Sequence, residues 1–343
     1  MKRFSWHLFL ILSVLIMTPA YTEEKNQRRA LTNAIIKGDL RIVQSIMESE
    51  KVGIEEVSEN DHEGITPLVE AAVHGKIPII KYLIEKGASV NGLAGKKSTP
   101  LTKLIQSGSS KLSCQQLIEL TRFFIDSGAD INCAGEGGYT PLMNACKYTR
   151  CIDLMDMLLA QGALIDVKAS DENTAFSLAI RYTNVNAFRF LLNRGADATM
   201  DCKGLSPLGV AAAEGNVAMA KLIIEELKAD VNKYDSLGGT PIFWAALNGC
   251  SAMIAFLVER GADINAKTNQ MINVEKQPKS YLSRIKSFAT FPKNSTPLTF
   301  AKWFEMISAA NLICDLGGIE FEKVDVKEWT ATYMTDEIVT SSP

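Results

Sequence analysis

Histidine is the side chain most often used for proton transfer near neutral pH and for zinc binding, and this chain contains only three. His7 lies in an apolar N-terminal stretch, whereas His62 and His74 occupy a predicted turn tip and a predicted helix end. Catalysis or metal binding normally needs histidines grouped with carboxylates, and neither G-x-S-x-G nor H-E-x-x-H occurs in the chain. The sequence therefore predicts a protein that is not an enzyme and has no metal site and no cofactor.

Two glycine-rich segments have the residue types of nucleotide-binding loops, "GLAGKKST" at residues 92–99 and "GEGGY" at residues 135–139. A phosphate-binding loop needs four residues between its glycines, and the first segment has two. The second segment follows no predicted strand, as a dinucleotide-binding loop would. Both are interpreted as turns. A formal net charge of −3 also gives no global basic field, so nucleic acid is not an expected partner.

The N-terminus has the order of a secretory signal. Lys2 and Arg3 precede the apolar residues 8–17, and small residues at Thr18 and Ala20 come before a charged segment. The apolar run is shorter than the about 20 residues of a membrane-spanning helix. We therefore predict a signal peptide at residues 1–20 and a periplasmic or secreted protein. Two alternatives stay open, a membrane tether formed by an uncleaved N-terminal segment and a cytosolic chain in which this segment is a buried helix.

Seven cysteines are scattered along the chain, and no two of them form a C-x-x-C pair. A zinc cluster is therefore not expected, and most of these residues are interpreted as small buried apolar side chains. In an oxidising compartment one disulfide is compatible with the sequence, which does not identify its partners.

A short unit recurs along the chain at about 33 residues, which is typical of a stacked repeat array. In the unit at residues 64–91, Thr66 is predicted to cap a helix whose first residue is Pro67. Gly75 interrupts the apolar pattern, and a second amphipathic run ends at Gly87, where a left-handed conformation costs little. The same Thr-Pro or Ser-Pro start recurs at Thr66, Thr99, Thr140, Ser206, Thr240 and Thr296, and Thr174-Ala175 fills the remaining gap.

These units resemble the ankyrin repeat family, whose pattern is D-x-x-G-x-T-P-L-H-x-A-A-x-x-G followed by a second helix and G-A-D-V-N. The stretches "DHEGITPLVEAAVHG", "DCKGLSPLGVAAAEG" and "DSLGGTPIFWAALNG" match best. The resemblance implies an all-α solenoid of paired antiparallel helices with short β-turn fingers. The expected layout is an N-terminal capping repeat at 30–60, six repeats at 61–266, a basic insertion at 267–294, a C-terminal capping repeat at 295–321 and a tail at 322–343.

The chain departs from the family pattern at the histidine that follows Pro-Leu. In this chain the residues at that position are Val69, Thr102, Met143, Ser177, Gly209, Phe243 and Thr299. The hydrogen bonds that this histidine makes in the family therefore cannot be carried over. Glu172 and Lys97 also stand where the family has glycine, which predicts looser turns there.

The resemblance further implies that the chain recognises another protein through a concave surface of turn tips and first helices. By resemblance the contact positions are His62, Glu63, Ile65, His74, Tyr139, Lys147, Tyr148, Asp171, Asn173, Arg181, Tyr182, Lys203, Leu205, Glu214, Leu237 and Asn248. Aromatic and arginine side chains are frequent interface anchors, which draws attention to Tyr139, Tyr148, Arg181 and Tyr182. An alternative is a secreted effector or toxin-like protein with activity in, or recruited by, its non-repeat segments.

The insertion at residues 267–294 carries six lysines and arginines against one glutamate, which gives +5 in a chain of net charge −3. Such a run is often a solvated loop. However, apolar residues in "SYLSRIKSFATF" follow helical spacing between the basic ones, as a docking or membrane-surface segment requires. We predict a salt-sensitive contact of this insertion with an acidic partner or an anionic membrane surface.

Overall fold

The computed structural model describes residues 23, 26–49, 52–55, 65–92, 99–270, 272–273, 290–291, 293–303 and 307–318. The predicted signal peptide and the predicted tail lie outside these residues, as do His62 and Glu63. The chain divides into two compact units, Met1–Ala175 and Phe176–Pro343. We call them the first and second unit and describe each by itself.

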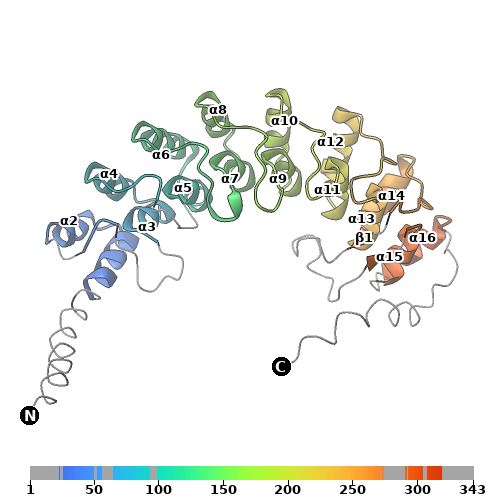
Figure 1. Cartoon of the computed structure of the whole chain (residues 1–343), viewed down its shortest axis with the longest axis horizontal. Coiled ribbons are helices and arrows are strands. Elements are labelled where there is room, and N and C mark those ends of the chain that lie inside the picture. The colour runs from blue at the N-terminus through green and yellow to red at the C-terminus, as the bar shows by residue number, and fades with distance from the viewer. Residues whose placement is uncertain are drawn as a thin grey trace, which may run out of the picture. The chain divides into compact units, whose positions relative to one another are not determined.

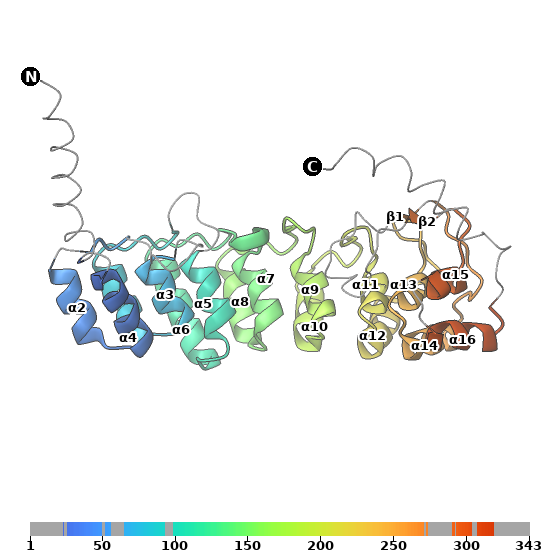
Figure 2. The same cartoon turned by 90° about the horizontal axis from the view of Figure 1, so that it is seen from below.

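The first unit is built of helix pairs. Residues 26–37 are helical and precede α2 (Leu40–Glu48). The following elements are α3 (Pro67–Val73), α4 (Ile77–Glu85), α5 (Pro100–Gly108), α6 (Cys114–Asp126), the 3-10 turn η1 (Glu136–Gly138), α7 (Pro141–Tyr148) and α8 (Ile152–Ala160). Within this unit the odd-numbered helices α3, α5 and α7 form one layer and α4, α6 and α8 form the other (Figure 1). Figure 2 shows η1 at one end of the helices, where the connecting turns lie.

The second unit repeats this arrangement. Its helices are α9 (Ala175–Arg181, whose first residue ends the first unit), α10 (Val185–Asn193), α11 (Pro207–Ala213), α12 (Val217–Leu227), α13 (Pro241–Leu247), α14 (Ser251–Glu259), α15 (Pro297–Trp303) and α16 (Ile307–Asp315). The two-residue strands β1 (Ile272–Asn273) and β2 (Thr290–Phe291) pair antiparallel. They are the only strands among the described residues, so the predicted all-α architecture is confirmed.

The Thr-Pro pairs start the first helix of each pair, as predicted. Thr66 has extended backbone angles, its hydroxyl oxygen accepts a hydrogen bond from the Val69 N–H at 3.4 Å, and Pro67 occupies the first helical position. The same cap is formed by Thr140 with Met143 and by Ser206 with Gly209. A side-chain oxygen satisfies one of the N–H groups that a helix start leaves without a partner, and proline lacks such an N–H.

Threonine replaces the missing family histidine in two repeats and supplies a different hydrogen bond. Thr99 and Thr102 form a reciprocal capping box, in which each side-chain oxygen accepts from the other residue's N–H at 3.2 Å. Thr296 and Thr299 form the same pair at 3.4 Å. The helix start is therefore stabilised by hydrogen bonds between residues three positions apart.

Asparagine side chains join successive repeats inside each unit. In the first unit, the Asn132 amide donates to the Gly162 carbonyl at 3.1 Å and accepts from the Leu164 N–H at 2.9 Å. In the second unit, Asn232 makes the same pair of bonds with Gly261 and Asp263. Gly261 has φ +88°, which fits the predicted left-handed helix end.

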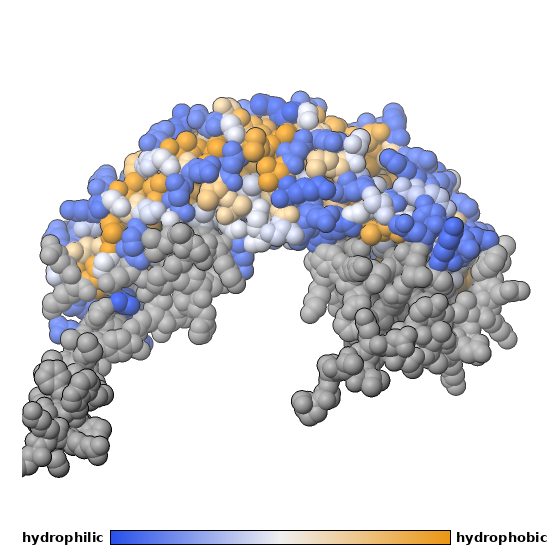
Figure 3. Space-filling model, viewed as in Figure 1, coloured by the Kyte–Doolittle hydropathy of each residue, from blue (hydrophilic) through white to orange (hydrophobic). Residues whose placement is uncertain are grey.

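The core of each unit lies between its two helical layers. In the second unit the α10 residue Phe188 is fully buried, and its ring stacks on Phe176 with the centroids 5.1 Å apart. In Figure 3, hydrophobic residues show mainly between the layers, and hydrophilic residues dominate the outer rim. Each helix pair therefore buries its apolar faces against its neighbours, as a stacked repeat requires. No helix among the residues that the structure describes has the length and apolarity needed to cross a membrane.

Candidate partner-binding surface

Five of the predicted contact residues come together in the first unit, and we call them the tyrosine–lysine cluster: Tyr139, Lys147, Tyr148, Asp171 and Asn173. Tyr139 follows η1, and Lys147 and Tyr148 form the last turn of α7. The Lys147 ammonium lies 5.1 Å from the centroid of the Tyr139 ring and 4.7 Å from that of the Tyr148 ring. The negative faces of both rings attract the cation, so the two aromatic side chains hold the lysine in place.

Tyr139 is itself fixed by the next turn. Its hydroxyl donates to the Asp171 carboxylate at 2.8 Å, and the Asn173 amide donates to the same carboxylate at 2.6 Å and to the Tyr139 hydroxyl at 3.2 Å. Asn173 is completely buried. Its prediction as a contact residue is therefore corrected, because its side chain orients Tyr139 and Asp171 and has no surface to offer a partner.

Tyr148 is the most accessible member of the tyrosine–lysine cluster, with 37% of its surface exposed. Its hydroxyl accepts a hydrogen bond of 3.4 Å from the amide of Gln106, a residue of α5 that sequence reasoning did not single out. An exposed aromatic ring beside a positioned cation combines the two side-chain types that contribute most to protein interfaces.

The second unit brings together Arg181 and Glu214 from neighbouring repeats. The Arg181 Nε donates to a Glu214 oxygen at 2.7 Å, and only 8% of the arginine side chain is exposed. Tyr182 follows Arg181 and is 44% exposed, while Asn248 is half-buried. Tyr182, a predicted aromatic anchor, is thus accessible, whereas the Arg181 side chain is mostly buried in its ion pair with Glu214.

Lys203 and Leu205 are both buried, so their prediction as contact residues is also corrected. Lys203 has φ +55° in a tight turn, and Leu205 exchanges backbone hydrogen bonds with Cys202 at 2.9 and 3.0 Å. Leu237 is half-buried and packs against Gly204. A Cβ atom added to Gly204 would lie only 2.6 Å from the Leu237 Cγ. In this part of the second unit, consecutive turns pack on one another and cover side chains that a single repeat would expose.

The remaining predicted residues make local contacts or lie outside the described part of the chain. His74 Nε2 is 3.1 Å from a Glu70 carboxylate oxygen on the same helix, and Ile65 is half-buried. His62 and Glu63 lie outside the described residues, so their prediction stays untested. No group of three or more histidine, cysteine or acidic side chains with metal-binding geometry occurs in the ranges that the structure describes.

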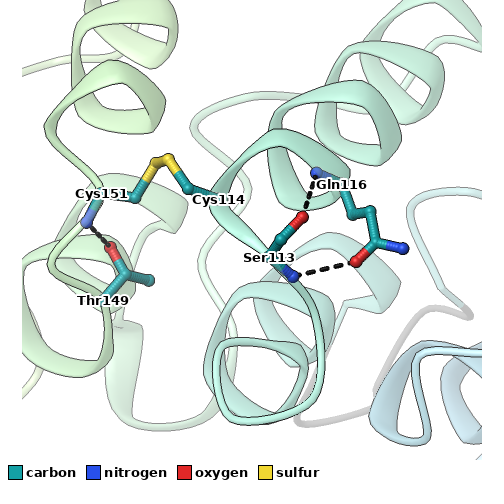
Figure 4. Close-up of a disulfide and its surroundings, with 5 residues drawn as sticks. All are labelled: Ser113, Cys114, Gln116, Thr149 and Cys151. Carbon is teal, nitrogen blue, oxygen red and sulfur yellow. Dashed lines mark hydrogen bonds between the residues drawn. A yellow bond between two sulfur atoms is a disulfide. The ribbon is translucent and has the colours of Figure 1, made fainter.

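A disulfide joins Cys114, the first residue of α6, to Cys151, the N-cap of α8, with the Cα atoms 5.6 Å apart (Figure 4). Ser113 and Gln116 form a capping box beside it, and the Cys151 N–H donates to the Thr149 hydroxyl at 3.3 Å. The sequence did not identify this pair. The available signal was that Cys114 lies in the extra residues 109–117 of its repeat, which no other part of the repeat pattern explains.

Asp235 in the second unit has an unusual titration. Its carboxylate accepts from the Trp244 indole N–H at 2.6 Å and from the backbone N–H groups of Leu237 and Gly239 at 3.0 and 3.1 Å. These donors favour the charged form, but burial outweighs them and raises the pKa of Asp235 to about 7, with Asp201 adding to the rise.

We expect the free energy of unfolding to decrease as the pH is raised from about 4 to about 7, because of Asp235. The native carboxyl holds its proton up to about pH 7, whereas in the unfolded chain it ionises near the ordinary aspartate pKa of 3.8. The native state therefore binds more protons in this window, so raising the pH favours unfolding. Urea unfolding at unit pH steps should show a contribution of about 4 kcal/mol. Asp235→Asn should remove this decline, and Asp230→Asn, which alters an exposed carboxylate, should keep it; a decline unchanged in Asp235→Asn would contradict the assignment.

A family model described as ankyrin repeats (3 copies) matches four overlapping stretches of the chain, residues 9–94, 31–117, 112–202 and 176–268. Together these stretches run from residue 9 to residue 268, which is more than half of the 343 residues. The last stretch ends at the start of the predicted basic insertion.

Known proteins share this region. An ankyrin repeat and KH domain-containing protein of Caenorhabditis briggsae is 26% identical over 261 residues, which are 74% of this chain and 9% of that protein. Alpha-latrocrustotoxin-Lt1a of Latrodectus tredecimguttatus is 27% identical over 246 residues, 70% of this chain and 15% of the toxin. The chain thus spans a small part of the length of these relatives.

Among solved structures, the human ASB11 ankyrin repeat domain matches the chain with a TM-score of 0.55 at 24% identity. The match covers 68% of this chain and 98% of that domain. At this identity the likeness supports the fold, and the contact residues must be argued from the chain's own geometry.

Proposed function

The chain belongs to the ankyrin repeat family, whose repeats indicate a protein-binding scaffold, and from this premise we propose that it acts after export and binds its partner through the tyrosine–lysine cluster. The observation that carries the proposal is the Lys147 ammonium placed between two tyrosine rings, one of them exposed. A cation and an aromatic face that are already positioned lose little conformational entropy on binding, which favours affinity.

Export is supported by two independent features. The N-terminal residues follow the order of a secretory signal. The Cys114–Cys151 disulfide belongs to the first unit, and such bonds persist mainly in oxidising compartments such as the periplasm or the cell exterior. N-terminal sequencing of the chain made in its own host should find a start near residue 21. A retained Met1 or Lys2 would instead favour the tethered or cytosolic alternative.

Partner binding is tested by placing a photo-crosslinking phenylalanine analogue at Tyr148 of the mature chain. Ile42, which is 48% exposed on α2, serves as the matched position. We expect a specific protein to be crosslinked from position 148 and not from position 42. Lys147→Glu should then weaken binding of that protein at least tenfold, about 1.4 kcal/mol, because it reverses the charge between the two rings.

The control for this charge reversal is Lys233→Glu, at an exposed lysine of the second unit, which should bind within about twofold of the unaltered chain. Recovery of no protein from either position, at any concentration tested, would count against a scaffold function. Equal losses of affinity in Lys147→Glu and Lys233→Glu would show that binding depends on the net charge of the chain and that the tyrosine–lysine cluster is not part of the interface.

The basic insertion is proposed as a second contact, with an acidic partner or an anionic membrane surface. Its first residues are anchored in the second unit, because the Tyr234 hydroxyl donates to the Lys267 carbonyl at 2.8 Å and the Asn269 N–H donates to the Gly238 carbonyl at 3.1 Å. The pairing of β1 with β2 joins its two arms. Replacing residues 271–291 by a short linker should weaken binding at low salt and reduce its salt dependence. If both are unchanged, the insertion takes no part in binding.

A toxin-like or effector activity is the second candidate function, and the similarity to alpha-latrocrustotoxin-Lt1a favours it. In this case the activity would depend on the non-repeat segments. Deletion of the tail at 322–343 distinguishes the two functions, because a scaffold should keep its affinity for the crosslinked protein and an effector of this kind should lose its activity.

A further inference from the structure

A cavity of about 650 Å³ lies in the first unit beside the tyrosine–lysine cluster. Its lining includes the apolar residues Leu112, Leu117 and Ile152, both cysteines of the Cys114–Cys151 disulfide, and the polar residues Tyr148 and Arg150. This volume lies within the range of ligand-binding pockets and is large enough for two or three side chains of a peptide.

The extra residues of the second full repeat create this cavity. The second helix of that repeat, α6, has 13 residues, whereas α4 and α8 have 9 each. The turn before α6 is held on both sides, since the Lys111 ammonium donates to the Val73 carbonyl at 2.5 Å and the disulfide joins Cys114 to α8. The walls are therefore fixed before any ligand arrives, which lowers the entropy lost on binding.

The electrostatics of the cavity favour an acidic occupant. The charged residues that line it are Arg150 and Asp153, and Lys111 and Lys147 are the chain neighbours of the lining residues Leu112 and Tyr148. Together these four residues carry a net charge of +2 in a chain of net charge −3. Arg150 is exposed, and its planar guanidinium is suited to bind a carboxylate through two parallel hydrogen bonds.

Tyr148 connects this cavity to the proposed interface. Tyr148 is one of the residues that line the cavity, and its ring centroid lies 4.7 Å from the Lys147 ammonium. A partner segment that contacts the tyrosine–lysine cluster at Tyr148 therefore lies next to the cavity.

We propose that the cavity docks an acidic peptide segment of the partner protein, whose apolar side chain contacts Leu112, Leu117 and Ile152 while a neighbouring carboxylate pairs with Arg150. The inference rests on the proposed scaffold function and specifies the chemistry of the partner. An unstructured acidic segment fits better than a nucleic acid, because the walls are apolar and offer no row of aromatic rings on which bases could stack.

The test uses the oxidised mature chain and synthetic octapeptides in which Leu, Ile, Phe or Trp is flanked by Asp or Glu. Matched sets carry Lys or Ser in place of the acidic residues. We expect the acidic set to bind at least tenfold more tightly than either other set and to weaken with salt. Arg150→Glu should lower the affinity of the selected acidic peptides at least tenfold, and Arg122→Glu, at an exposed arginine of α6 outside the cavity, should change it less than twofold.

Each other result overturns the docking proposal. Equal binding of the acidic and serine sets, or equal effects of Arg150→Glu and Arg122→Glu, would show that the cavity selects no acidic segment. Binding of phosphatidylserine vesicles without binding of any peptide would identify a membrane contact instead. If the protein crosslinked at position 148 binds Arg150→Glu normally, the scaffold function stands and the cavity is not its docking site; if neither protein nor peptide binds, both proposals fail.

Discussion

Replacing Cys114 and Cys151 together by serine is expected to lower the free energy of unfolding of the first unit by about 3 kcal/mol. The disulfide links residues 37 positions apart, and loss of such a link returns the corresponding loop-closure entropy to the unfolded chain. The cost is concentrated in the junction of two neighbouring repeats, because each repeat is stabilised by its neighbours. Urea unfolding followed by far-UV circular dichroism measures the change.

The matched control replaces two free cysteines, Cys133 and Cys250, which are half-buried and form no disulfide. This double variant keeps the Cys114–Cys151 bond and should lose less than about 1 kcal/mol. A reducing agent should destabilise the unaltered chain and the control but leave the Cys114, Cys151 double variant unchanged. Identical unfolding of the unaltered chain with and without reductant would show that the bond does not contribute to stability.

The helix pairs could be predicted from sequence because their signals are local. A Thr-Pro pair both caps a helix and fills its first position, and Thr66, Thr140 and Ser206 do so through an N–H only three residues ahead. The disulfide could not be predicted in the same way. Whether Cys114 meets Cys151 depends on the length of the turn between α5 and α6, and several other pairings of seven cysteines satisfy the sequence equally well.

The candidate surface was predictable only in part, because burial depends on the neighbouring turn. Tyr139 and Tyr148 were predicted from the repeat pattern, but the position of Lys147 between their rings follows from the fold. Asn173 and Lys203 occupy the same type of turn position as accessible residues, yet the adjacent turn covers them. A repeat pattern thus identifies positions that face outward in an isolated repeat, and stacking decides which of them stay accessible.

The same reasoning about stacking predicts a large effect in the second unit. Phe188→Ala is expected to lower the free energy of unfolding by about 4 kcal/mol, because Phe188 is fully buried on α10 and its ring stacks on Phe176. Removal of the ring leaves a cavity in the core and takes away the stacking partner of Phe176. Urea unfolding of the mature chain measures the loss.

Phe190→Ala provides the control on the same helix, since a residue two positions away lies on a different face. The Phe190 ring is half-buried, and the Arg194 guanidinium lies 5.2 Å from its centroid. Its removal should cost about 1 kcal/mol or less, because the ring already meets water. If the two variants unfold at the same urea concentration, α10 does not bury the face assigned to it, and the packing between the layers of the second unit would have to be revised.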